Sequence, residues 1–173
     1  MKKFLLFFII FLQFGCDSIP KKDRDIKQIK CPKVFFSSEN STYSIGDLDS
    51  FNLDDIEFKA AINNYEFTEK CFSDKKSNYY LLDLLILVEP INPSNSNISL
   101  PIFVILYDDD DNIIDKYFYR ISADINYSEK VFEYLSTEVI GNLDVVIDRN
   151  VQVSSVTVGF IKINNWSLIF ENT

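Results

Sequence analysis

The chain has 173 residues, a net charge of −9 and no histidine. This length is sufficient for one domain with its own core. The acidity disfavours nucleic acid as a partner, because that binding relies on positive charge that neutralises phosphates. The absence of histidine removes the most frequent general base and metal ligand, so we expect no metal or other cofactor.

The first residues have the composition of an export signal. Lys2 and Lys3 precede an apolar run over residues 4–12, which Phe14 extends past Gln13. A run of roughly 11 residues is shorter than the about 20 that a membrane-spanning helix needs. We therefore predict a signal peptide over residues 1–15.

The end of this run, FGC, resembles the lipobox of bacterial lipoproteins. Gly15 precedes Cys16, although Gln13 stands where the family usually has leucine. The resemblance implies a diacylglyceryl group on Cys16 and cleavage that makes Cys16 the first residue. The alternative is an ordinary secretory signal with a cysteine nearby by chance.

Lipidation would place the mature chain in the cell envelope, facing the periplasm from the inner or the outer membrane. Residues 16–30 are polar and without apolar periodicity, so they are predicted to be a tether, either solvated or resting its lysines on anionic head groups. Cleavage removes Lys2 and Lys3 and no acid, so the net charge would fall by two, from −9 to −11.

The three cysteines support this interpretation. If Cys16 carries lipid, Cys31 and Cys71 remain as a pair. Exported proteins fold in an oxidising compartment, so we predict a Cys31–Cys71 disulfide. Two separate buried thiols are the alternative, and two sulfurs without histidine are too few ligands for zinc.

The rest of the chain, residues 31–173, is predicted to be one β domain. Residues 55–62 alternate between apolar and polar side chains, which is the period of a half-buried strand. Residues 81–88 are apolar on both faces except at Asp83, so the strand that contains them is expected to be central. About eight strands are predicted in all, over residues 33–38, 55–62, 65–72, 79–88, 101–107, 113–121, 131–140 and 155–163.

Polar segments separate these strands. SDKKSN and DDDDN are predicted hairpin turns, and EPINPSNSNISL is a predicted loop. NWSLIF, near the C-terminus, is either a short helix or a last strand. Many short strands without a helical stripe predict an antiparallel β-sandwich, which includes an immunoglobulin-like arrangement, with a small barrel as the alternative.

The domain also resembles an uncharacterised family of alphaproteobacterial envelope lipoproteins. The resemblance lies in Cys-Pro after the anchor, a second cysteine, a Pro-x-Phe strand, an acidic turn and two later strand motifs. These correspond to Cys31-Pro32, Cys71, Pro101-Ile102-Phe103, Asp108–Asn112, Lys116–Tyr119 and Val158-Gly159-Phe160. Asn112 replaces the usual glycine of the turn and is expected to tolerate positive φ. The resemblance implies envelope location and no particular activity.

No segment predicts catalysis. Asp108, Asp110 and Asn112 alternate as in a calcium loop, but Ile113 and Tyr119 occupy the positions of its glycine and bidentate glutamate, so a turn explains them better. Asp83 is expected to be an outward-facing or hydrogen-bonded acid rather than a general base. The chain has only four glycines, which leaves no phosphate-binding loop.

Aromatic side chains are the remaining candidates for binding. Six of them, Tyr79, Tyr80, Tyr107, Tyr117, Phe118 and Tyr119, lie on predicted strands, where neighbours such as Tyr117 and Phe118 face opposite sides. The sequence predicts a non-enzymatic, membrane-anchored lipoprotein whose β domain contacts another envelope protein. The alternative is a ligand-binding module, for example one that binds a glycan, on the same anchor.

Overall fold

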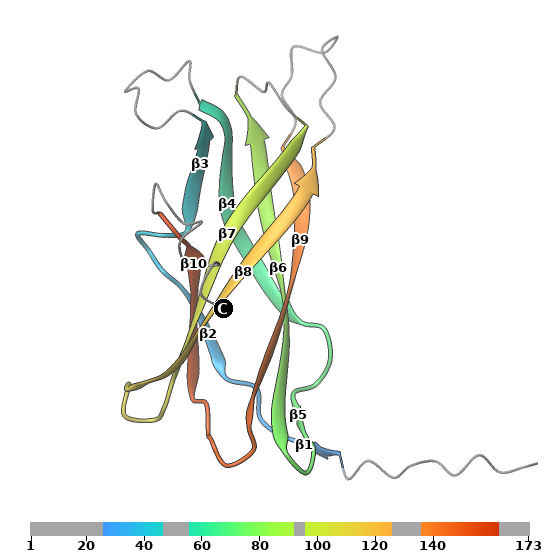
Figure 1. Cartoon of the computed structure of the whole chain (residues 1–173), viewed down its shortest axis with the longest axis vertical. Helices are drawn as coiled ribbons and strands as arrows, with labels where there is room; N and C mark the ends of the chain where they lie inside the picture. The colour runs from blue at the N-terminus through green and yellow to red at the C-terminus, as the bar shows by residue number, and fades with distance from the viewer. Residues whose placement is uncertain (1–25, 47–55, 92–95, 126–135, 163–173) are drawn as a thin grey trace, which may run out of the picture.

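A computed structural model describes residues 26–46, 56–91, 96–125 and 136–162, which form an all-β domain (Figure 1). This part of the chain contains ten strands and no helix, and accordingly no helix that is long and apolar enough to cross a membrane. The predicted signal peptide, Cys16, most of the predicted tether and the NWSLIF segment lie outside these ranges.

The strands form two sheets packed as a sandwich, as predicted, and not a closed barrel. The first sheet, sheet A, has the order β1-β5-β6-β4-β3, with β9 on the other side of β6. Its strands are β1 (Lys27–Gln28), β3 (Thr42–Gly46), β4 (Ile56–Phe67), β5 (Phe72–Ser73), β6 (Ser77–Pro90) and β9 (Thr137–Asp148).

The second sheet, sheet B, has the order β2-β10-β7-β8. Its strands are β2 (Lys33–Phe36), β7 (Asn97–Tyr107), β8 (Ile113–Asp124) and β10 (Ser155–Phe160). All strand pairs are antiparallel except β2 with β10, whose parallel pairing brings the start and the end of the domain side by side.

The core lies between the inward faces of the two sheets. Along β6, every second residue from Asn78 to Pro90 is buried. Leu84 and Ile86 of this strand, and Ile102 and Val104 of β7, are fully buried. As predicted, β6 is central, with β9 on one side and β4 and β5 on the other.

One continuous strand, β4, replaces two predicted strands. Its register with β6 shifts between Ile62 and Asn64, which marks a β-bulge at Asn63. The extra residue keeps Asn63 and Asn64 exposed and returns Phe67 to the side of the core. The break in alternation at this bulge makes one strand look like two in the sequence.

The position of β9 differs from the predicted strand over residues 131–140. The strand spans residues 137–148, and residues 131–135 lie outside the described ranges. The predicted strand stops before Gly141, whose missing side chain leaves room for Ile121 of the other sheet. An added Cβ at Gly141 would lie 2.1 Å from Cδ1 of Ile121.

Proline and short edge strands account for the other differences. The predicted loop over residues 89–100 is shorter, because β6 continues to Pro90 and β7 begins at Asn97. Pro101 is tolerated inside β7 because the paired part of β10 ends opposite Ile102, so no strand needs the N–H that proline lacks. Its carbonyl accepts a hydrogen bond from Ile161 N, just beyond the end of β10. The three short strands β1, β3 and β5 were not predicted as separate strands.

Candidate functional site

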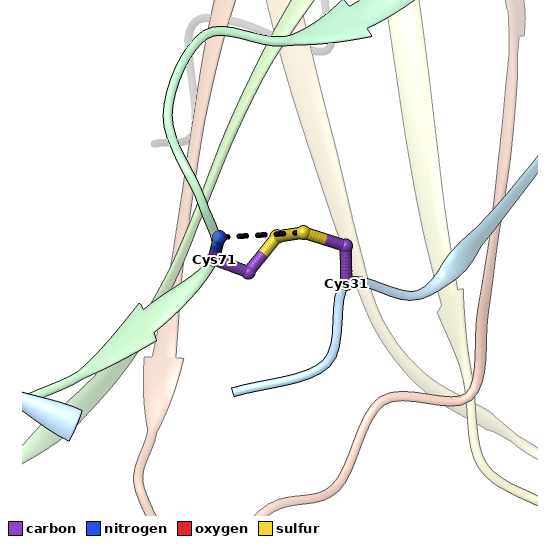
Figure 2. The surroundings of a disulfide bond; sticks show 2 residues. All are labelled: Cys31 and Cys71. Carbon is purple, nitrogen blue, oxygen red and sulfur yellow. Dashed lines mark hydrogen bonds between the residues drawn. A yellow bond between two sulfur atoms is a disulfide. The ribbon is translucent and has the colours of Figure 1, made fainter. Parts of the chain in front are cut away.

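The predicted disulfide joins Cys31 to Cys71 (Figure 2), with the two Cα atoms 5.2 Å apart. Cys31 lies between β1 and β2, and Cys71 immediately precedes β5. Two backbone contacts support the bridge: Cys71 N donates to Cys31 Sγ at 3.3 Å, and Ile29 N donates to Cys71 O at 2.9 Å. The chain is therefore fixed at the point where it crosses from the edge of sheet A to the edge of sheet B.

The acidic turn between β7 and β8 is held by its own hydrogen bonds. Asp108 Oδ1 accepts from Asp110 N at 2.9 Å and from Asn112 N at 2.8 Å, and Oδ2 accepts from Asn112 Nδ2 at 3.1 Å. These hydrogen bonds lower the pKa of Asp108, and the one from the Asn112 side chain has the largest effect. The carboxylate thus stabilises the turn. Within the described residues, no three histidine, cysteine, aspartate or glutamate side chains are grouped so that they could hold a metal ion.

The residue with positive φ in this turn is Asp111, at 61°, and not Asn112 as expected from the family resemblance. Asp111 N donates to Asp108 O, which closes the reversal before the strand resumes. A short hairpin loop of this kind needs one left-handed residue at its end, and here that residue comes one position earlier in the chain.

Asp83 is half-buried on the outer face of sheet A, where it accepts a 2.7 Å hydrogen bond from Asn142 Nδ2. Its strand neighbours on that face, Leu81, Leu85 and Leu87, are also half-buried. The structure places Asp83 away from the core, as expected for an outward-facing acid with a polar partner.

The six predicted aromatic residues divide between the core and the two faces. Tyr80 is buried, and Tyr79 stacks on Phe72 and donates to Asp74 Oδ2. Tyr117 and Tyr119 point inward along β8. Their hydroxyls reach backbone carbonyls of β9, and burial is the main cause of their raised pKa values.

Phe118 and Tyr107 belong to an apolar patch on the outer face of sheet B, which we call the sheet B patch. Strand register brings its members together: Phe35 pairs with Thr157, Thr157 with Ile105, and Phe103 with Phe118. The patch consists of Phe35, Phe103, Ile105, Tyr107, Ile113 and Phe118. Phe35 is 53% exposed, Ile113 52% and Phe118 39%.

Gly159 shapes the centre of this patch. A Cβ at Gly159 would lie 2.7 Å from the Phe103 ring and 2.9 Å from Cβ of Asn40. The missing side chain therefore lets the Phe103 ring lie against the backbone of β10, next to Phe118 of β8. The uninterrupted apolar run over residues 101–107 indicates a strand with apolar side chains on both faces, but only the sheet order adds Phe35 from β2.

Comparison of the chain with protein-family models, with curated proteins and with solved structures gives no significant match.

Proposed function

We propose that the protein is a lipoprotein of the bacterial cell envelope, anchored through Cys16, whose β-sandwich binds another envelope protein and has no catalytic activity. The anchor is supported by the apolar run that ends in FGC. Export is supported by the Cys31–Cys71 bridge, because disulfides persist in oxidising compartments.

The observation that carries the binding function is the sheet B patch. Contiguous exposed apolar surface is uncommon on monomeric proteins and marks sites of association. Three large side chains at the patch, Phe35, Ile113 and Phe118, are more than one third exposed. Aromatic residues, phenylalanine included, are enriched at the centres of protein interfaces.

Charge around the patch favours an acidic partner surface. Lys33 on β2 and Lys116 on β8 are exposed, and each neighbours the patch on its outer side. The chain as a whole is acidic, at −9, so two lysines beside an apolar centre distinguish this face. We infer a partner that presents apolar side chains bordered by carboxylates.

The outer face of sheet A is the competing surface. Ile140 there is 56% exposed and pairs with half-buried Leu85. Polar side chains border this pair: Glu138 and Asn142 flank Ile140 on β9, and Asp83 and Glu66 lie across from one another on β6 and β4. Burying these polar groups against an apolar partner would cost free energy, which favours sheet B.

Site-specific crosslinking in the native membrane tests the proposal. A photoreactive amino acid at position 118 should give one protein adduct, and the same probe at position 140 should give none. Phe35→Ser should abolish the adduct at 118 while the protein keeps its thermal stability, since Phe35 is largely exposed. Equal crosslinking at both positions, or an adduct that is indifferent to Phe35→Ser, would contradict the assignment.

A further inference from the structure

A hollow of about 490 Å³ lies at the end of the sandwich where β1 enters the domain, the lower end in Figure 1. One wall is the chain over residues 27–33 on both sides of the disulfide, and the opposite wall is the loop over residues 149–154 between β9 and β10. Ser73, Asn78 and Tyr80, from β5 and β6, lie between these walls. None of the sheet B patch residues contributes to it.

Both walls are fixed by buried contacts. Asn78 is 6% exposed, and its Nδ2 donates to Arg149 O at 3.2 Å and to Val151 O at 2.9 Å. The backbone N–H of Val153 bonds to the hydroxyl of buried Tyr80. The disulfide holds the other wall. The hollow is therefore formed before any ligand arrives, which lowers the entropic cost of binding.

The hollow is positive in an acidic protein. Four cationic side chains line it, Lys27, Lys30, Lys33 and Arg149, against one acid, Asp109. Asp109 already accepts a hydrogen bond from Gln152 Nε2 at 3.4 Å. None of the four cations has an ion pair or side-chain hydrogen bond to the described residues. Cationic side chains that line one recess without counter-charges concentrate anions there.

The position of the hollow bears on the source of the anion. Its first lining residue, Lys27, follows Cys16 by eleven positions in the sequence. Eleven residues span at most about 40 Å when fully extended. If Cys16 carries lipid, this end of the domain thus stays close to the membrane surface, where phosphate head groups are abundant and attract basic side chains.

We propose that this hollow binds a phosphate-bearing anion, with Arg149 as the bidentate ligand and Lys27, Lys30 and Lys33 as point charges. The expected source is an anionic phospholipid head group, an expectation that rests on the proposed lipid anchor. A soluble phosphate is the other source of the same chemistry.

Lysine labelling of the full chain tests this site. The protein is reconstituted in phosphatidylcholine vesicles, in vesicles that also contain phosphatidylglycerol, and in phosphatidylcholine vesicles with added inorganic phosphate. Amine modification of individual lysines is then measured by mass spectrometry. Lys76 is the control for general attraction at this end, because it is exposed but does not line the hollow, and exposed Lys116 is the remote control.

The site predicts that labelling of Lys27, Lys30 and Lys33 falls several-fold with anionic vesicles or with phosphate, while that of Lys76 and Lys116 changes little. Arg149→Gln should remove the protection, whereas Lys116→Gln should not. Protection by vesicles alone assigns a lipid head group, and protection by inorganic phosphate assigns a soluble anion.

Equal protection of Lys76, or no protection in either arm, would overturn the site. The phosphate arm does not depend on the anchor. Whether Cys16 anchors the protein is measured separately, by fractionation of the Cys16→Ser variant. The two proposals can therefore fail independently.

Discussion

The hydroxyl of Tyr119 donates a 2.9 Å hydrogen bond to the backbone carbonyl of Asp144. Tyr119 lies on β8 at one edge of sheet B, and Asp144 lies on β9 at one edge of sheet A, which run side by side in Figure 1. Tyr117 makes the same kind of bond to Val146 O at 3.0 Å. Two tyrosines thus satisfy carbonyls on an edge that would otherwise be open to another strand.

Tyr119→Phe should lower the free energy of unfolding by about 1 kcal/mol, the usual net value of one hydrogen bond. It leaves a carbonyl of β9 without its tyrosine partner. Urea denaturation measures the change. Tyr107→Phe is the matched control, because the Tyr107 hydroxyl has no hydrogen bond to any residue in the described ranges. An equal loss in both variants would mean that the cross-sheet bond contributes nothing specific.

The same two tyrosines predict loss of stability at alkaline pH. Burial raises the pKa of Tyr117 to about 12 and also raises that of Tyr119, whereas an unfolded tyrosine titrates near about 10. The folded state favours the protonated phenols, so their contribution is complete below about pH 10 and is lost as the pH rises through the folded pKa values. Melting temperature against pH should therefore fall less steeply above pH 10 in the Tyr117→Phe/Tyr119→Phe variant than in the wild type.

Gly141→Ala should destabilise the domain by about 1–3 kcal/mol through overpacking, because the new methyl group would meet Ile121 at 2.1 Å. Ile121→Val removes the clashing Cδ1 atom and alone should cost about 1 kcal/mol. The double variant should be more stable than the sum of the two losses implies. Strict additivity in the double-mutant cycle would show that the two positions do not share this space.

Breaking the Cys31–Cys71 bridge should cost about 4 kcal/mol by the loop-entropy relation for the 40-residue separation. Cys31→Ala and Cys31→Ala/Cys71→Ala should lose about the same amount, since either removes one bond. Peptide mapping without reduction should recover the two cysteines joined. Recovery of both as free alkylated thiols would refute the disulfide.

Cys16→Ser should release the protein from the membrane fraction or stall its processing. Cys16 is the residue expected to carry the lipid, and a short apolar run by itself does not span a bilayer. Fractionation and immunoblotting measure the outcome, with Ser18→Ala as the neighbouring control. A processed Cys16→Ser protein that stays in the membrane would contradict the lipoprotein assignment.

Asp108 predicts a stability loss in acid. Hydrogen bonds from Asn112 and from the turn backbone lower its pKa. Its contribution is present above the unfolded value of about 3.9 and is lost as the pH falls through the lower folded value. Asp108→Asn should flatten the decline of melting temperature below about pH 4. Asp110→Asn should not, because the Asp110 carboxylate accepts no hydrogen bond from the described residues.

Local patterns were sufficient for several features. Alternation over residues 55–62 and the apolar run over 81–88 predicted a half-buried and a central strand, because side-chain period follows directly from the pleat of a strand. Cysteine number and the predicted export signal led to the prediction of the bridge between Cys31 and Cys71, which the structure contains. The turn at Asp108 was predicted because aspartate and asparagine bond to their own neighbouring backbone.

Tertiary structure decided what depends on partners distant in the chain. The predicted strand over residues 131–140 stops before Gly141, but the structure continues it there, because Ile121 of the other sheet fills the space beside this glycine. The bulge at Asn63 interrupts the alternation of buried and exposed residues along β4, and only the pairing with β6 shows that the strand continues beyond it. Phe35 and Phe118 are 83 residues apart in the sequence, and only the order β2-β10-β7-β8 places them on one face. Which side chains share a surface is set by sheet order and register, and these depend on long-range pairing that local periodicity does not specify.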